Sequence, residues 1–214
     1  TIGISDINSI EQKIKDAGDY KILKVKLGSN DDKTTIEAIR QFTDKPITVD
    51  VNQGWNDKYF VLDMIHWLAE KNVLFVEQPM KKNLFDEMAW VTAQSPLPTI
   101  ADESVQRFSD IEKLKNIFSG INIKLMKCTG MNEAYQMALY AKKSGMKILI
   151  GCMSETSCAI SAAAQLSPLC DWADLDGALL IKNDCFCGIR FSDGKIILED
   201  TPGIGAVPSE KLFD

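Results

Sequence analysis

Short apolar runs alternate along nearly the whole chain with segments in which apolar residues recur every three or four positions. The first pattern is typical of buried β-strands and the second of amphipathic helices. The runs return at intervals of roughly 25 residues, the length that a strand, two short loops and a crossover helix require. The pattern predicts eight strands: Thr1–Ile4, Ile22–Leu27, Ile47–Asn52, Val73–Glu77, Thr99–Asp102, Ile121–Leu125, Ile148–Cys152 and Trp172–Asp176.

Residues that favour helix ends lie between several of these runs. Polar residues precede two predicted helices, and a glycine follows a third. The signals, each with the helix it bounds, are Ser5 and Asp6 before Ile7–Ala17, Ser109 before Ile111–Ile117, and Gly145 after Asn132–Ser144.

The continuous repetition of strand and helix predicts an α/β fold, a TIM-like (β/α) barrel that occupies residues 1–214 as one domain. An open, doubly wound parallel sheet is the alternative architecture. After the last repeat, Ile189–Phe191 and Lys195–Leu198 flank the turn residues Ser192–Gly194, which indicates an appended hairpin.

Composition narrows the class of protein. The chain has 45% hydrophobic residues and a formal net charge of −6, with lysines scattered among acidic residues, so we expect no nucleic-acid or anionic-lipid partner. Its apolar runs are far shorter than a membrane span, and we expect a cytoplasmic protein. Apolar helix faces are compatible with a homo-oligomer.

The spacing of the cysteines and the scarcity of histidine exclude further classes of site. Six cysteines lie without the paired spacings of a zinc site or a disulfide framework, so we expect reduced thiols. The single histidine, His66, falls within the helical pattern Tyr59–Lys71. This scarcity argues against histidine-based triads and most zinc hydrolases.

Charged residues occupy the predicted carboxyl ends of the strands, where the active site of such a barrel lies. Three carboxylates on three successive strands would converge, and like charges brought together are costly unless a cation offsets them. Oxygen ligands without histidine or cysteine favour one Mg²⁺ ion. The strand-end residues are Lys24, Lys26, Asp50, Glu77, Asp102, Lys124, Asp174 and Asp176.

The lysines suggest proton transfer. A lysine acts as a base only when nearby positive charge favours its neutral form, and Lys24 and the metal would supply that charge to Lys26. Lys124 would face the same substrate from the opposite side of the barrel. A base on each face of a carbon is the arrangement of a racemase or epimerase, and a metal would stabilise the enolate.

The strand-end motifs resemble the enolase superfamily, and more narrowly its muconate-cycloisomerase-like group. The aspartate pair on the last strand resembles the dipeptide epimerases of the L-Ala-D/L-Glu type. The motifs are Lys24-Val25-Lys26, Asp50-Val51-Asn52-Gln53-Gly54-Trp55, Val76-Glu77-Gln78-Pro79, Ala101-Asp102-Glu103-Ser104, Asn122-Ile123-Lys124-Leu125-Met126-Lys127 and Asp174-Leu175-Asp176.

The resemblance implies a role for each residue. Asp50, Glu77 and Asp102 would be Mg²⁺ ligands, and Lys26 and Lys124 the two proton acceptors. Lys24 would support the substrate carboxylate, and Asp174 and Asp176 would hold the α-ammonium group of a dipeptide. Thr1 and Cys152 would line the substrate pocket. Glu103 and Glu155 would either support the residues that contact the metal and the substrate, or cap their own loops.

The implied function is 1,1-proton transfer at the α-carbon of the C-terminal residue of a dipeptide such as L-Ala-L/D-Glu. Family members carry an α+β capping domain before the barrel, whereas this chain begins at the first barrel strand, so we expect a fragment or an incomplete gene model. Two alternatives stay open: another reaction of the group, of the muconate cycloisomerase or o-succinylbenzoate synthase type, and an inactive metal-binding barrel fragment.

Overall fold

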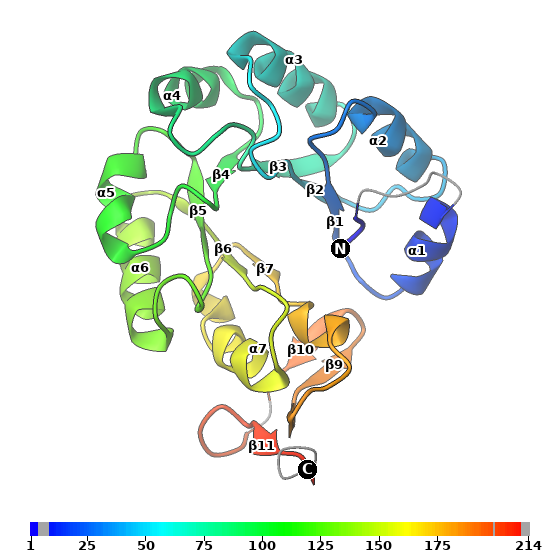
Figure 1. Cartoon of the computed structure of the whole chain (residues 1–214), viewed down its shortest axis with the longest axis vertical. Helices are drawn as coiled ribbons and strands as arrows, with labels where there is room; N and C mark the ends of the chain where they lie inside the picture. Colours follow the sequence, from blue (N-terminus) through cyan, green and yellow to red (C-terminus); the bar gives the residue numbers. More distant parts are fainter. Residues whose placement is uncertain (4–8, 199, 211–214) are drawn as a thin grey trace. The chain divides into compact units, whose positions relative to one another are not determined.

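The computed structural model describes residues 1–3, 9–198 and 200–210, and the chain forms two compact units. The first consists of residues 1–104 and 113–120, and the second of residues 105–112 and 121–214. Figure 1 shows strands and helices alternating along the sequence in both units.

The first unit is built on four parallel strands whose order in the sheet follows the chain. Their side chains are almost all buried, as apolar runs covered on both faces require. The register places Lys26 beside Asp50 and Asp50 beside Glu77. The strands are β1 (Leu23–Lys26), β2 (Ile47–Asp50), β3 (Val73–Glu77) and β4 (Thr99–Ala101).

Helices of the first unit lie on the outer side of these strands (Figure 1). Each buries one apolar face: on the helix over residues 32–40, Ile36 and Ile39 are fully buried. The helix over residues 58–69 is capped by Asp57, whose carboxylate accepts a hydrogen bond from Phe60 N at 2.8 Å. The helices are α1 (Ile10–Asp16), α2 (Asp32–Arg40), α3 (Lys58–Ala69) and α4 (Phe85–Gln94), and the short α5 (Ile111–Leu114) crosses the boundary between the units.

The second unit continues the same alternation. Its strands are β5 (Gly120–Ile123), whose first residue belongs to the first unit, β6 (Lys147–Gly151) and β7 (Trp172–Asp174). Its α-helices are α6 (Met131–Lys143) and α7 (Ser157–Ala164), and its 3₁₀ helices are η2 (Phe108–Asp110), η3 (Ser167–Leu169) and η4 (Gly177–Leu180). In neither unit does the strand order reverse, as a doubly wound sheet requires.

Two small antiparallel pairs follow β7. The predicted hairpin is confirmed: β9 (Arg190–Ser192) pairs with β10 (Lys195–Ile197). Its turn residues Asp193 and Gly194 both have positive φ, as the tightest hairpin turns require. In the other pair, β8 (Phe186–Cys187) meets β11 (Val207–Pro208).

Most predicted elements are confirmed within a few residues, with four differences. At the first predicted strand, Ile2 forms only an isolated bridge to Val25, and residues 4–8, with the proposed Ser5 and Asp6 caps, lie outside the described residues. Ser109 lies inside η2 and does not precede a helix as its cap. The helix predicted over Ile111–Ile117 ends at Leu114.

The fourth difference concerns the last strand, which was predicted to reach Asp176. Strand β7 ends at Asp174, and Asp176 is the residue before η4 and has helical backbone angles. The alternation that would place the two aspartates on one face of a strand therefore does not extend to Asp176.

The loops after β1 and β2 are held together by close backbone contact. Gly28 has φ +103°, and a Cβ atom there would lie 2.6 Å from Val51 O. A Cβ on Gly54 would lie 2.6 Å from the Cα of Gly28, so both positions need glycine. The buried Asp32 carboxylate accepts hydrogen bonds from Gly28 N at 3.0 Å and from Trp55 Nε1 at 2.8 Å. These contacts fix the strand ends that carry Lys26 and Asp50.

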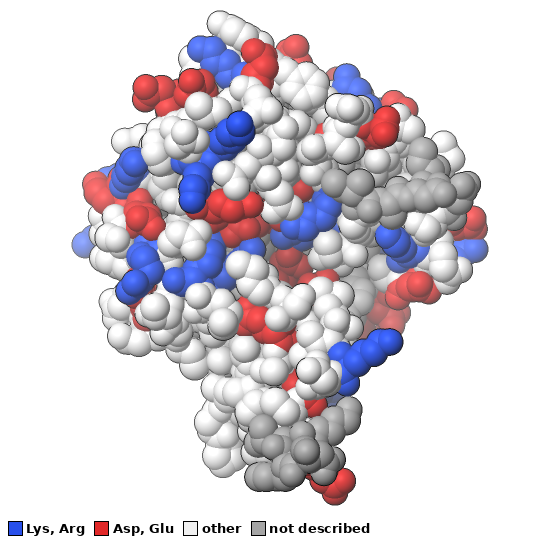
Figure 2. Space-filling view, in the orientation of Figure 1, with Lys and Arg blue, Asp and Glu red and all other residues white. Residues whose placement is uncertain are grey.

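On the face drawn in Figure 2, acidic and basic side chains are interspersed. Within the described part of the chain, no helix combines the length and the apolar character needed to cross a bilayer. The six cysteines are all free thiols, as predicted.

Candidate metal centre and active site

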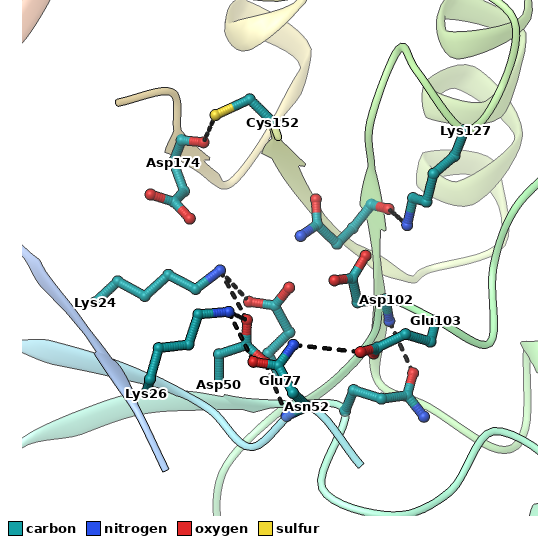
Figure 3. A network of polar contacts seen from close by, with 12 residues as sticks. Lys24, Lys26, Asp50, Asn52, Glu77, Asp102, Glu103, Lys127, Cys152 and Asp174 are labelled. Atoms are coloured by element: carbon teal, nitrogen blue, oxygen red, sulfur yellow. Dashed lines mark hydrogen bonds and ion pairs between the residues drawn. The ribbon is translucent and has the colours of Figure 1, made fainter. Parts of the chain in front are cut away.

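Three carboxylates of the first unit meet at the carboxyl ends of adjacent strands (Figure 3). Asp50 and Glu77 end β2 and β3, and Asp102 follows β4 directly. One oxygen of each lies within 4.8 Å of one oxygen of the others, and all three residues are buried. Neighbouring parallel strands end at the same edge, so the order of the strands brings the three residues to one place.

Lys24 and Lys26 reach these carboxylates from β1. Lys24 Nζ lies 3.1 Å from Asp50 and 2.9 Å from Glu77, and its side chain is 9% exposed. Lys26 Nζ lies 2.7 Å from Asp50, and its side chain is 31% exposed. The two lysines share one face of β1, as the alternation of strand residues predicts. Lys26 is thus the more exposed of the two lysines.

The cluster carries an electrostatic cost. Burial, with the nearby charges of Asp50 and Asp102, raises the pKa of the Glu77 carboxyl to about 7, although Lys24 opposes that rise. Closely spaced buried carboxylates are costly without a compensating cation, and their hard oxygen atoms are the donors that Mg²⁺ prefers. The donor set fits the predicted metal.

A side-chain network extends from Lys26 away from the carboxylates. Lys26 Nζ donates to Asn52 Oδ1 at 2.8 Å, and Asn52 Nδ2 donates to Glu103 Oε1 at 3.2 Å. Asn52 has φ +46°, a region in which asparagine is among the better tolerated residues. Glu103 is thus joined to Lys26 through one intervening side chain, that of Asn52, which was not among the residues predicted to form the site. The signal that could have found it is an asparagine two residues after a candidate ligand.

The remaining predicted residues belong to the second unit. Lys124 follows β5 directly and is 7% exposed. Cys152 follows β6 and donates from Sγ to the backbone oxygen of Asp174 at 3.3 Å. The structure thus brings Cys152 to the end of β7, beside the two aspartates at positions 174 and 176.

The environment of Cys152 is acidic and poorly solvated. Burial, and then the charge of Asp174, raise the pKa of its thiol to about 12, with Asp176 and Glu155 adding to the effect. Glu155 Oε1 accepts a hydrogen bond from Met153 N at 2.7 Å, so this residue caps its own loop. A neutral thiol among carboxylates leaves a negative surface suited to a cationic group.

Thr1 is exposed and precedes the bridge that joins Ile2 to β1. Among the predicted site residues of the first unit, Lys24 forms ion pairs with Asp50 and Glu77, and Lys26 forms one with Asp50. Asp102 completes the group of three carboxylates that could hold a metal ion.

Comparison with known proteins identifies relatives along nearly the whole chain. The model of the enolase C-terminal domain-like family matches residues 7–212. An L-Ala-D/L-Glu epimerase of Bacteroides thetaiotaomicron is 58% identical over 208 residues, which are 97% of this chain and 54% of that protein.

Solved structures also match this chain along nearly its whole length. The N-succinyl Arg/Lys racemase from Bacillus cereus matches with a TM-score of 0.90 and 30% identity, over 98% of this chain and 60% of that one. A dipeptide epimerase from Cytophaga hutchinsonii, complexed with Mg and the dipeptide D-Ala-L-Val, matches with a TM-score of 0.87 and 26% identity, over 98% and 61% of the two chains. The chain thus spans a little over half the length of the curated relative.

Proposed function

The chain belongs to the enolase C-terminal domain-like family, and we propose that it carries the catalytic machinery of a Mg²⁺-dependent dipeptide epimerase. Family membership confirms the predicted fold class, the TIM-like (β/α) barrel of the enolase superfamily. The proposed reaction is 1,1-proton transfer at the α-carbon of the C-terminal residue of a dipeptide such as L-Ala-L/D-Glu. The observation that carries the proposal is the buried group Asp50, Glu77 and Asp102, found in a chain 58% identical to a protein named L-Ala-D/L-Glu epimerase.

Asp50, Glu77 and Asp102 would hold the ion. A Mg²⁺ bound by them would stabilise the negative charge that develops on the substrate carboxylate when the α-proton is removed. Lys24, which already neutralises Asp50 and Glu77, would offer its remaining donor capacity to that carboxylate.

Lys26 and Lys124 are the proposed proton acceptors. Lys26 would remove or return the proton at its Nζ, held in place by Asp50 and Asn52. Lys124, at the end of β5, would do the same for the opposite configuration. Two acceptors of the same chemical type suit a reaction that runs in both directions.

Asp174 and Asp176 are proposed to bind the α-ammonium group of the dipeptide, and Thr1 and Cys152 to line the pocket. Two carboxylates beside a neutral thiol favour a cation over an acylated amine.

A second candidate, racemisation of an N-succinyl amino acid, is favoured by the structural match to the N-succinyl Arg/Lys racemase. Such a substrate has no α-ammonium group, so the two aspartates distinguish the candidates.

The remaining predictions concern the location, the domain organisation and the partners of the protein. We propose a cytoplasmic protein, which six free cysteines support, and one domain over residues 1–214. A small-molecule dipeptide is the proposed partner. A homo-oligomer, and the lack of a nucleic-acid or membrane partner, stay predictions.

The proposed reaction is tested by incubating the protein with a library of L,L-dipeptides in D₂O with Mg²⁺, followed by mass spectrometry and chiral separation. We expect one deuterium at the α-carbon of the C-terminal residue, with inversion, and loss of uptake in the Lys26→Ala/Lys124→Ala variant. A Lys15→Ala/Lys33→Ala variant is the matched control.

Deuterium uptake that survives in the Lys26→Ala/Lys124→Ala variant contradicts the assignment of these lysines as proton acceptors. Uptake by N-succinyl amino acids alone favours the second candidate. Cyclisation or dehydration products without dipeptide exchange would point to the other reactions of the group, and no turnover at all to an inactive barrel.

A further inference from the structure

Gln78 lies between Glu77, one of the three candidate Mg²⁺ ligands, and Pro79, and its backbone is strained. It is fully buried and has φ +37°, in the left-handed region that non-glycine residues rarely adopt. A residue before proline also prefers an extended backbone. Such a conformation persists only where surrounding contacts hold it, and it is most frequent at functional sites.

The backbone of Gln78 joins the ends of two neighbouring strands. Its N–H donates to Ile100 O on β4 at 2.8 Å. Its carbonyl oxygen accepts from Gln53 N, in the turn after β2, also at 2.8 Å. Gln78 itself follows β3, so one residue connects the ends of β2, β3 and β4. These are the strands whose ends carry Asp50, Glu77 and Asp102.

The side chain of Gln78 uses its full hydrogen-bonding capacity, two donors and two acceptor sites. Oε1 accepts from Asp102 N at 3.0 Å and from Ser104 N at 3.1 Å. Nε2 donates to Met80 O and to Ser104 Oγ, each at 2.9 Å. The amide therefore fixes the backbone of Asp102 relative to Glu77, the residue next to Gln78 in the chain.

We infer that Gln78 is a positioning residue that sets the spacing of the three carboxylates and thereby the size of the ion they accept. The inference rests on the metal site of the proposed function. Mg²⁺ requires short distances and near-octahedral geometry, whereas Ca²⁺ tolerates longer distances and varied geometry. Loosening Asp102 against Glu77 would weaken Mg²⁺ binding more than Ca²⁺ binding. A residue that only stabilised the fold would not change this preference.

The test is the affinity of the protein for MgCl₂ and for CaCl₂, each measured by calorimetry, in the wild type and in Gln78→Met. We expect Gln78→Met to weaken Mg²⁺ binding by about tenfold or more, as loss of a residue supporting metal ligands does, and Ca²⁺ binding by less than about threefold. Gln53→Met is the matched control, since Gln53 also has positive φ and bonds a backbone N–H, that of Lys82 at 3.0 Å. It should leave the ratio of the two affinities unchanged.

A milder pair of variants applies if Gln78→Met does not fold. Ser104→Ala removes one acceptor of the Gln78 amide and should lower the ratio of Mg²⁺ to Ca²⁺ affinity. Ser104→Thr keeps a hydroxyl group and should have the ratio of the wild type. Equal losses for both ions, or an unchanged Mg²⁺ affinity in both Gln78→Met and Ser104→Ala, would overturn the inference. A wild type that binds no Mg²⁺ would instead overturn the metal site, and the inference with it.

Discussion

The Nζ atom of Lys24 lies 2.9 Å from Oε2 of Glu77, and both side chains are almost completely shielded from solvent. The same Nζ lies 3.1 Å from Asp50, so one buried ammonium group serves two buried carboxylates. Removing one partner of a buried ion pair leaves uncompensated charge, which is far costlier than loss of an exposed pair. Lys24 therefore connects the stability of the fold to the charge of the candidate metal centre.

Lys24→Met should destabilise the protein strongly when divalent ions are chelated. We expect a loss of about 3 kcal/mol in unfolding free energy with EDTA, and a clearly smaller loss with saturating Mg²⁺, which would offset the same carboxylates. Urea denaturation under the two conditions measures both values. Lys15→Met, which breaks an exposed ion pair with Glu11, is the control and should cost under about 1 kcal/mol. Equal losses with and without Mg²⁺ would argue against an ion at this cluster.

Glu133 should contribute a pH-dependent part of the stability. Hydrogen bonds from Arg107 and from Phe108 N lower the pKa of this carboxyl to about 2, from a usual value of 4.5. A lowered pKa stabilises the folded state above pH 4.5, and the contribution disappears as the pH falls toward 2. Glu133→Gln should therefore lower the melting temperature at pH 7 but not near pH 2. The exposed Glu37→Gln is the control, and a pH-independent difference for Glu133→Gln would contradict the prediction.

Gly151 at the end of β6 should not accept a side chain. A Cβ atom there would lie 2.5 Å from Oδ1 of the buried Asn122 on β5. We expect Gly151→Ala to cost about 1–3 kcal/mol, as overpacking of a core does, and to cost less in an Asn122→Ala background. Gly3→Ala is the control, since no atom lies within 4 Å of the added Cβ. Additive costs in the double variant would show that the contact is not the cause.

Alkylation should distinguish the cysteines. Burial first, and neighbouring acidic charge second, raise the pKa of the Cys152 and Cys170 thiols to about 12, whereas Cys187 is exposed. Because the thiolate is the reactive form, iodoacetamide at pH 8 should modify Cys187 well before Cys152 or Cys170. Mass spectrometry of tryptic peptides over time measures the order. Early modification of Cys152 would show that its pocket is more open than the structure indicates.

The sequence predicted the parts of the site that depend on strand order. Asp50, Glu77 and Asp102 each stand at the end of an apolar run, and parallel strands in chain order end at one edge, so their meeting followed from pattern alone. The position of Asp176 could not be predicted this way, because strand alternation says nothing about where β7 turns into η4.

Gln78 marks another limit of sequence reasoning. Local preference disfavours a left-handed residue before proline, and its hydrogen-bond partners lie as far as 26 residues away along the chain. Asp32 is similar: it reads as an ordinary helix start, yet it bonds Trp55 across 23 residues. Contacts of this kind depend on loop conformations that hydrophobic periodicity does not encode.

Proton exchange at the α-carbon of L-Ala-L-Glu in D₂O, followed by ¹H NMR with saturating Mg²⁺, tests the central claim most directly. We predict loss of the glutamate α-proton signal together with the appearance of L-Ala-D-Glu, and loss of both changes with a chelator or in Asp102→Asn. A folded protein that binds Mg²⁺ but leaves the α-proton in place, or exchange that continues after chelation, would contradict it.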